Sequence, residues 1–293
     1  MHTAKSLLLL LLAFISTSGW TQVVGSIQNT KSDKSYFFYE VKLIDEFIER
    51  FNDEPNSYIR RQSRSLYGTD SFITRRQLIK SLFNKKQQWG QEVNLFTSSV
   101  SDTTNPLYLS FTDSNWFVLA QCVFLHNNQR ITLPLALHIT TIEGGSKWMI
   151  AGIGNSSIFD STLPPGLPTE DYYTTTGDYI PTSSHGTNFV TLTQLLNKSM
   201  HPADFFEPYL MATARGHQFI ELLQHEKLAF KHVSQMSFHF FTIPGWFFTV
   251  SSYKRKEDNR GWLISSLRQV DAVSKAKLKE HLLYYLHEYK GEL

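Results

Sequence analysis

Histidines and carboxylates are the side chains of this chain that could act as general bases and acids. A catalytic histidine needs a carboxylate that orients it inside a dry pocket. His138 and His239 fall in segments with strand-like patterns, yet residues 116–142 and 228–256 contain no Asp or Glu. Neither strand histidine can therefore find its acid within the strand segments.

The carboxylates nearest to these segments fall in predicted turns, where solvent exposure is expected: Asp113, Glu143, Glu257 and Asp258. A dyad would have to take its acid from a helix, for example Asp45 or Glu221. We assign no catalytic and no binding residue from the sequence, and we favour a binding protein over an enzyme.

A metal site is the second chemistry that histidines could support. The second half of the chain contains His201, His217, His225, His232 and His239. Zinc needs three or four converging ligands, usually with a local pair at a spacing such as HxxxH. None of these pairs has that spacing, so we expect no metal and no cofactor.

Cys122 is the one cysteine of the chain, so an intramolecular disulfide is impossible. It lies among apolar residues of a predicted strand, which favours a small core residue over a nucleophile. The chain also lacks G-x-S-x-G, P-loop and G-x-G-x-x-G motifs. Serine hydrolase, NTPase and Rossmann functions therefore have no support.

A basic stretch follows an acidic segment over residues 40–54. Its members are Arg60, Arg61, Arg64, Arg75, Arg76, Lys80, Lys85 and Lys86. Such a stretch could bind an anionic glycan or a lipid headgroup, but we favour solvated faces of opposite charge that pair with each other. The formal net charge of +2 gives no global field that would attract nucleic acid.

Hydrophobic spacing predicts helices and then strands in the first half of the chain. A helix is expected over residues 36–52, and a second begins at Thr74, where Gln77 completes a capping box. Strands are expected over 93–100, 107–111, 116–126, 130–142 and 147–154, with turns at Asn127–Asn128 and Gly144–Gly145.

The second half of the chain repeats this order. Residues 155–187 carry four prolines among many Ser and Thr without periodicity, which predicts a linker. Helices are then expected over 189–196 and 202–225. Strands follow over 228–233, 235–243, 246–254 and 261–270, and a basic amphipathic helix ends the chain over 272–289.

The two closing strands are similar in sequence. Trp148 is followed by Ile150 and Ile153, and Trp262 is followed by Ile264 and Leu267. This repetition predicts tandem α+β modules. Each module would pack N-terminal helices on a curved antiparallel sheet, the first over residues 22–154 and the second, with the C-terminal helix, over residues 188–293.

Helices packed on a curved antiparallel sheet that ends in a Trp-containing strand resemble the nuclear transport factor 2-like, or cystatin-like, superfamily. The resemblance covers most of both modules and lies in element order and in the strands of Trp148 and Trp262. It implies a cone-shaped fold that serves elsewhere as an enzyme, a ligand pocket or a dimerisation module. Two such modules after a leader resemble secreted bacterial proteins.

The N-terminus has the features of a secretory signal peptide over residues 1–21. Lys5 gives a positive start, Leu7 to Leu12 form the centre of an apolar segment, and small residues precede Gln22. The apolar segment is too short to span a bilayer, and no later segment reaches that length. We therefore expect an exported protein, periplasmic or extracellular, without a transmembrane segment after signal removal.

The predicted strand over residues 116–125 is apolar on both faces. One face should meet the module's own helices, and the other needs a second cover. The candidates are the sister module, a second copy of the chain, a pocket ligand, or further loops of the same module. The sequence thus predicts a non-catalytic binding or assembly protein of the cell envelope with a protein partner or self-association. The alternative is a small-ligand-binding protein or a pocket enzyme.

Overall fold

The computed structural model describes residues 40–160, 162, 174–198, 201–256 and 258–285, which all belong to one compact unit, Ser35–Leu293. The predicted signal peptide lies outside the described residues. Helices and strands contribute about equally, so the predicted α+β class is confirmed. Within the described ranges, no helix is long and apolar enough to cross a membrane.

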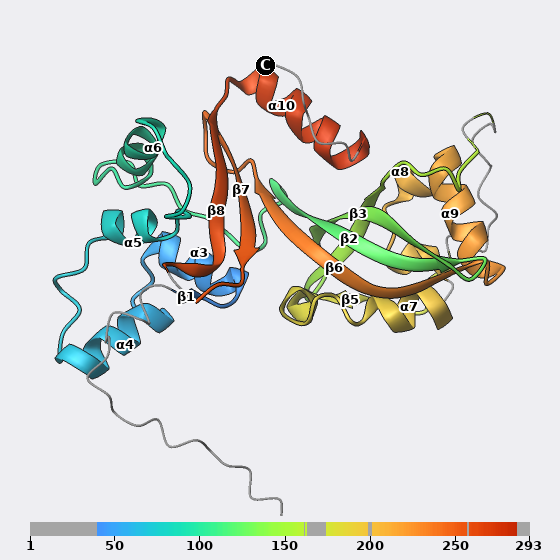
Figure 1. Cartoon of the computed structure of the whole chain (residues 1–293), viewed down its shortest axis with the longest axis horizontal. Coiled ribbons are helices and arrows are strands. Elements are labelled where there is room, and N and C mark those ends of the chain that lie inside the picture. Colours follow the sequence, from blue (N-terminus) through green and yellow to red (C-terminus); the bar gives the residue numbers. More distant parts are fainter. Residues whose placement is uncertain (1–39, 161, 163–173, 199–200, 257, 286–293) are drawn as a thin grey trace, which may run out of the picture. The chain divides into compact units, whose positions relative to one another are not determined.

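The eight strands of the described chain form a single curved sheet in the order β1-β8-β7-β6-β2-β3-β4-β5 (Figure 1). Their bounds are β1 Glu40–Val41, β2 Trp116–His126, β3 Gln129–Ile142, β4 Gly145–Ile153, β5 Ile180–Pro181, β6 Leu228–Phe240, β7 Trp246–Tyr253 and β8 Arg260–Gln269. At the centre of the sheet β2 pairs antiparallel with β6, and Val118 lies opposite Phe238. Strands from both halves of the sequence therefore share one hydrogen-bonded sheet.

The helices lie in two groups and a C-terminal segment. Before β2 come α3 (Ile44–Asn52), α4 (Tyr58–Tyr67), α5 (Arg75–Ser81) and α6 (Glu92–Val100). Before β6 come the 3-10 turns η2 (Thr182–Thr187) and η3 (Pro202–Asp204) and the helices α7 (Leu192–Lys198), α8 (Pro208–Met211) and α9 (Ala214–Gln224). After β8 come α10 (Ala272–Glu280) and the π-helical turn η4 (His281–Tyr285).

Each group of helices packs on strands from the other half of the sequence. Phe51 of α3 and Phe96 of α6 contact Phe248 of β7, with ring centroids 6.3 and 5.6 Å apart. In the other direction, Phe219 of α9 contacts Phe124 of β2 at 5.7 Å. The helices of the predicted first module thus cover strands of the predicted second module. In the reverse direction α9 packs on β2 and β4, while α7 lies against β6 of its own half, where the Asn197 side chain bonds to the Phe230 backbone.

Two short backbone bridges fix this exchange in equivalent places. Phe83, just after α5, bridges Ile264 of β8, and Phe206, just before α8, bridges Ile150 of β4. The Ile264 N–H donates to Leu82 O (2.8 Å), and the Ile150 N–H donates in the same way to Phe205 O (2.7 Å). Each half of the chain therefore adds one bridge to the closing strand of the other half.

The aromatic contacts beside these bridges also correspond. Phe83 meets Phe96 with ring centroids 6.0 Å apart, and Phe206 meets Phe219 at 5.9 Å. Both pairs are separated by thirteen residues in the sequence. The strand order on either side of β2 and β6 is symmetric as well, with β3 and β4 on one side and β7 and β8 on the other.

Some predicted elements differ from the structure. Residues 93–100, predicted as a strand, belong to helix α6, whose buried residues Phe96, Thr97 and Val100 lie on one helical face. Residues 107–111 form no strand. At the end of the predicted linker, Ile180 of β5 pairs with Trp148 of β4, so these residues are part of the sheet. The Thr74–Gln77 capping box is confirmed.

The exchanged helices lead to a prediction about fragments of the chain. Fragments 35–160 and 174–293 should each fail to unfold cooperatively when alone, because each lacks the surface that buries its aromatic side chains. When mixed, they should recover the near-ultraviolet circular dichroism and the thermal transition of the 35–293 chain. If either fragment alone gave a cooperative transition with ordered aromatic signals, the exchanged packing would be wrong.

Candidate functional site

The structure pairs His138 with a carboxylate that lies outside the strands. His138 Nε2 lies 2.5 Å from Oε1 of Glu207, the residue that precedes α8, and the Thr140 hydroxyl donates to the same oxygen at 3.2 Å. Both partners are half-buried. The hydrogen bond from His138 holds the pKa of Glu207 below its ordinary value. The sequence left open an acid from a helix such as Asp45 or Glu221; the acid that meets His138 is instead Glu207, which precedes α8.

The two carboxylates suggested by the sequence contact other histidines. Asp45 lies 3.2 Å from His185, and Glu221 lies 3.4 Å from His217 one helical turn away. Both carboxylates are about half exposed. Neither pair includes a strand histidine, so the structure does not bring the suggested acids to His138 or His239.

His239 is buried on β6, and no carboxylate of the described segments pairs with it. Its ring stacks on Phe117 (5.3 Å) and Phe247 (6.1 Å). Its Nε2 lies 2.9 Å from the Ser237 hydroxyl, and its Nδ1 lies 3.4 Å from the Thr249 hydroxyl. Burial lowers the pKa of His239 from 6.5 to about 3. The imidazole is thus neutral at physiological pH and fills the space between two aromatic rings.

The histidines considered for a metal site and Cys122 do not form a reactive centre among the described residues. Among the described residues, no group of three His, Cys, Asp or Glu side chains converges as a metal site would require. Cys122 is fully buried in the core, and this burial raises the pKa of its thiol. It therefore packs as a small core residue.

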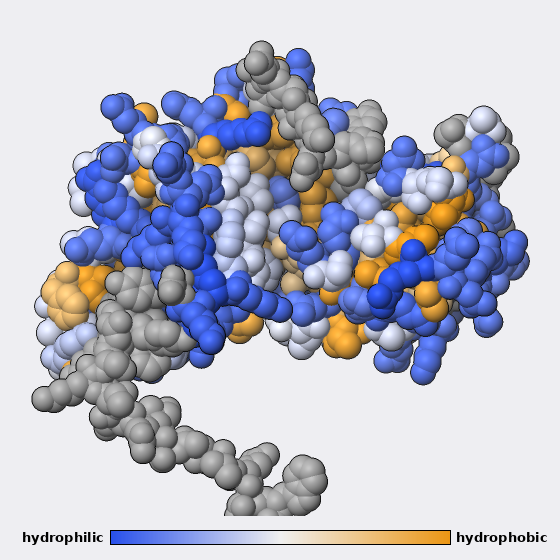
Figure 2. All heavy atoms as spheres, viewed as in Figure 1, coloured by the Kyte–Doolittle hydropathy of each residue, from blue (hydrophilic) through white to orange (hydrophobic). Residues whose placement is uncertain are grey.

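Several side chains of the basic stretch are paired within the protein. Arg60 forms an ion pair with Asp53 at 2.6 Å, and Arg64 forms one with Asp70 at 2.6 Å. Arg75 donates to three backbone carbonyls, which join α3, α6 and the segment after α6. The surface over α5 and α6 is mostly hydrophilic (Figure 2). These contacts support the interpretation that opposite charges of neighbouring segments pair with each other.

The second apolar face of β2 is covered at Phe117 by the C-terminal segment of the same chain. Leu278 of α10 and Leu282 and Leu283 of η4 form a cluster with Phe117 of β2. The same cluster contains Ala136, Ala151, Phe241, Phe247 and Val270. Gly152 permits this close packing, because a Cβ at that position would overlap the Leu283 carbonyl oxygen.

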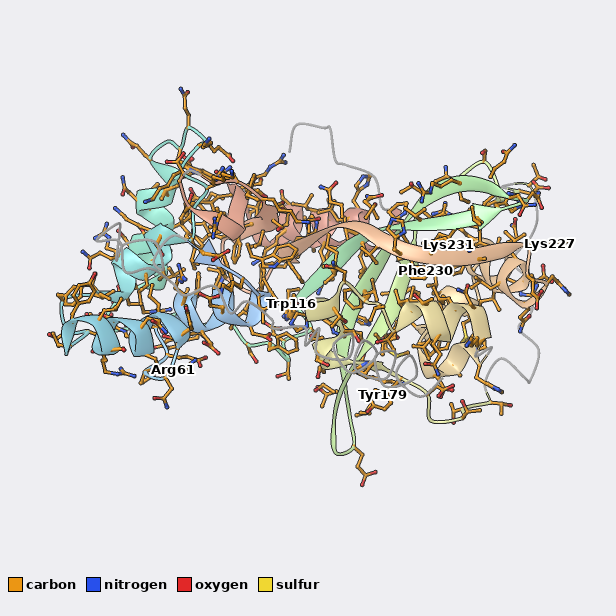
Figure 3. The ribbon with its side chains drawn as sticks, turned by 60° about the horizontal axis from the view of Figure 1, so that its bottom comes forward. Arg61, Trp116, Tyr179, Lys227, Phe230 and Lys231 are labelled. Atoms are coloured by element: carbon orange, nitrogen blue, oxygen red, sulfur yellow. The ribbon has the colours of Figure 1, made fainter. Side chains whose placement is uncertain are left out.

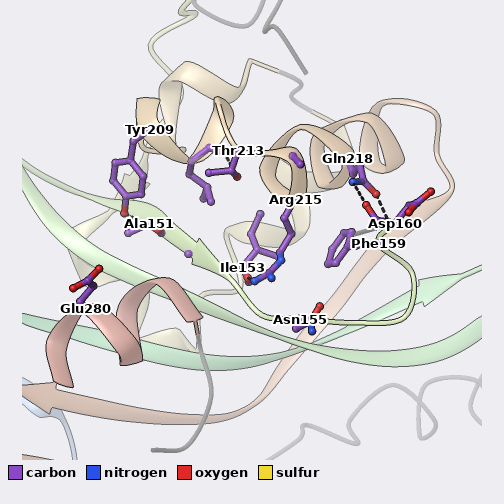
Figure 4. Close-up of a pocket in the computed structure, with 13 residues that line it drawn as sticks. Ala151, Ile153, Asn155, Phe159, Asp160, Tyr209, Thr213, Arg215, Gln218 and Glu280 are labelled. Atoms are coloured by element: carbon purple, nitrogen blue, oxygen red, sulfur yellow. Dashed lines mark hydrogen bonds between the residues drawn. The ribbon is translucent and has the colours of Figure 1, made fainter. Parts of the chain in front are cut away.

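A pocket of about 500 Å³ lies beside this C-terminal segment (Figure 4). The end of β4 and the segment after it form one wall, and α8 and α9 form another. Glu280, the last residue of α10, forms part of a third wall. The lining residues are Ala151, Gly152, Ile153, Asn155, Phe159, Asp160, Tyr209, Leu210, Thr213, Ala214, Arg215, Gln218 and Glu280.

Arg215 is the cation of this pocket. It stands in the first turn of α9, and its Nη1 donates to Ile153 O at 2.8 Å. Within the described part of the chain no carboxylate lies within ion-pairing distance of its guanidinium, and burial alone lowers the pKa of Arg215. A half-buried positive charge without a counter-ion among the described residues favours an acidic group from outside the protein.

Sequence reasoning missed this pocket. Thr213 caps α9 by accepting a hydrogen bond from the Gly216 N–H, and a Thr-Ala-Arg-Gly sequence at a helix start is a readable sign of a positive helix end. The walls from β4 and α10 are distant in sequence, so no local pattern could show that they meet α9.

No protein-family model matches the chain, and neither a curated protein nor a solved structure matches it. The resemblance to the nuclear transport factor 2-like superfamily rests on element order and on the two Trp-containing strands, and it stays a prediction.

Burial of His239 predicts a specific pH dependence of stability. Its folded pKa of about 3 lies below the unfolded value of 6.5, so the unfolded state takes up a proton first as the pH falls. The contribution of His239 to stability is therefore lost from pH 6.5 downward. Between pH 7 and pH 4 the free energy of unfolding of the wild type should therefore fall by about 3 kcal/mol more than that of His239→Phe.

Urea unfolding of both proteins at several pH values measures this difference. His232 is an exposed histidine of the same strand, so His232→Gln serves as the control. Its free energy of unfolding should change with pH as that of the wild type does. Equal pH dependence of wild type and His239→Phe would contradict a neutral buried imidazole.

Proposed function

We propose that this chain is an exported, non-catalytic binding protein that holds a small amphipathic acid in the pocket of Arg215. One observation carries this proposal: the half-buried Arg215 guanidinium has no carboxylate partner among the described residues, and it lines a cavity of about 500 Å³. A cavity of this size is typical of small-molecule sites.

The pocket offers different chemistry to the two ends of such a ligand. Arg215 supplies a planar group that can bind a carboxylate through two hydrogen bonds. The Gln218 amide bonds to the backbone N–H and C=O of Asp160 and so holds the pocket wall in place (Figure 4). The positive end of the α9 dipole adds to the field at the same place. Ile153, Phe159 and Leu210 give apolar surface for the body of the ligand.

The carboxylates of the pocket do not suggest acid–base catalysis. The Asp160 side chain is fully exposed, and hydrogen bonds from the Thr162 hydroxyl and N–H hold its pKa below the ordinary value. Glu280 is exposed at the end of α10. No histidine, cysteine or lysine lines this pocket. This lining supports binding over chemistry.

One observation favours the competing function, a pocket enzyme. His138 and Glu207 form a half-buried pair of the kind that orients a general base. Neither residue lines the pocket of Arg215, however. An esterase or isomerase activity lost in both His138→Asn and Glu207→Gln, with folding intact, would support the enzyme instead.

Export and a two-module origin are the remaining parts of the proposal. Export rests on the leader-like sequence of residues 1–21. Tandem duplication, in a form where the two modules have exchanged their helices, is supported by the symmetric strand order and the equivalent bridges at Ile150 and Ile264. A protein partner in envelope assembly stays a prediction.

The proposal predicts that Arg215→Gln weakens binding of amphipathic acids. Anilinonaphthalene sulfonate, which joins a sulfonate to apolar rings, can serve as the fluorescent probe, with decanoate as competitor. Loss of a charge-assisted contact costs about 1.5–3 kcal/mol, so the Kd of the probe for Arg215→Gln should be about tenfold to a hundredfold higher than for the wild type. Arg215→Lys should retain part of the affinity.

Arg268→Gln is the matched control, because Arg268 is an exposed arginine of β8 outside the pocket. Thermal unfolding of each variant shows whether the lost Ile153 hydrogen bond has changed the fold. Probe binding that is the same in wild type and a folded Arg215→Gln would refute the proposed site.

A further inference from the structure

A second cavity lies where β6 extends past the end of β7. Strand β6 pairs with β7 only over Ser237–Phe240, so residues 228–236 have β2 on one side and no strand on the other within the described chain. Phe230 and Lys231 mark this extension in Figure 3. The cavity measures about 410 Å³. It shares no lining residue with the pocket of Arg215.

Four of the polar side chains of this cavity have no partner among the described residues, whereas the hydroxyl of the fifth, Ser234, donates to Gln121 O at 3.0 Å. Asn188, Gln235, Ser252 and Lys254 line it, and no other described residue forms a hydrogen bond or ion pair with their side chains. Gln235, Ser252 and Lys254 are exposed, as is Asn188. Amide, hydroxyl and ammonium groups are therefore all available to a ligand.

An indole forms the apolar part of the same cavity. Trp262 of β8 lines it, is partly exposed, and stands edge-on to Phe238 with ring centroids 4.7 Å apart. The lining includes one lysine and no carboxylate. An aromatic surface surrounded by uncharged donors and acceptors suits a molecule with many hydroxyl groups, and Lys254 adds a preference for a negative one.

We infer that this cavity binds a glycan that contains acidic sugars. The ring of one sugar would lie on Trp262, its hydroxyls would bond to Asn188 and Gln235, and its carboxylate would meet Lys254. This inference does not depend on the proposed function at Arg215, because the two cavities are separate.

The backbone at Asn188 supports a ligand-binding role for this residue. Asn188 and Phe189 both have left-handed backbone angles, with φ of 51° and 53°. For a bulky residue such as Phe189 this conformation is costly, and it persists because the ring is fully buried against Trp148. The strained turn places Asn188 at the cavity, where its side chain has no structural partner among the described residues.

An added peptide strand is the less favoured occupant. The free edge of β6 is interrupted by irregularities in its pairing with β2 near Ser234 and Lys231. Asn197 also occupies the edge at Phe230, where its side chain bonds to both the backbone N–H and C=O. Bulges and blocked edge groups of this kind disfavour strand addition.

Nuclear magnetic resonance titration of the indole N–H signals tests this inference. The signal lost in Trp262→Phe identifies Trp262 among the six tryptophans. Tetragalacturonate should shift this signal with a Kd on the order of 0.1–1 mM, and neutral galactotetraose should bind about tenfold more weakly. Lys254→Ala should remove that difference, and Asn188→Gly, which suits the left-handed backbone, should weaken both sugars several-fold.

Lys231→Ala, an exposed lysine of β6 outside the cavity, is the control and should bind both sugars as the wild type does. The inference is overturned if neither sugar shifts the Trp262 signal. It is also overturned if Lys254→Ala and Asn188→Gly bind as the wild type, or if only an extended Ser/Gly-rich peptide shifts the signal.

Discussion

The pairing of β2 with β6 is the interaction on which the rest of the structure depends. It joins the two halves of the sequence over the whole length of β2, and Trp116 of β2 stacks on Phe240 of β6 at 5.3 Å. Because each group of helices packs on strands from the other half, neither half can bury its aromatic residues until this pair has formed. Such non-local contacts close long loops, which costs conformational entropy. Burial of large aromatic surfaces compensates this cost.

The two faces of the sheet are covered by different parts of the chain. One face carries the large core that contains Trp116, Phe124, Trp148 and Phe248 beneath both helical groups. The other face is covered near Phe117 by α10 and η4. The sequence left open whether a second copy, a ligand or the same chain covers this face. At Phe117 the cover comes from the same chain. The apolar character of β2 at Phe117 therefore reflects internal packing, whereas Leu119 and Leu125 on the same face are partly exposed.

Sequence patterns predicted the strands and turns whose conformation is decided by neighbouring residues in the sequence. The strict alternation of apolar residues in β3 predicted its buried face, and Asn127 and Asn128 predicted a tight turn because Asn tolerates positive φ, observed at 50° and 63°. Helix α6 was missed because β-branched residues at its ends resemble a strand, whereas the packing of Phe96 decides its conformation. The exchange of helices, the Glu207 partner of His138 and the surroundings of Arg215 could not be predicted, because each depends on contacts between distant segments.

The two halves of the chain use one corresponding position in different ways. Glu207 and Asn84 each donate a backbone N–H to the carbonyl of the bridging isoleucine, Ile150 or Ile264. The Glu207 side chain then bonds to His138, whereas the Asn84 side chain accepts a hydrogen bond from Arg255 at 2.8 Å. The backbone hydrogen bonds at this place are thus the same in both halves, while the side chains differ in charge and in partner. Because the backbone bridges fix the fold, side chains around them are free to differ between the halves. A pocket with a half-buried arginine, lined from both halves of the chain, and a cavity in the second half with one lysine among uncharged polar groups are consistent with that freedom.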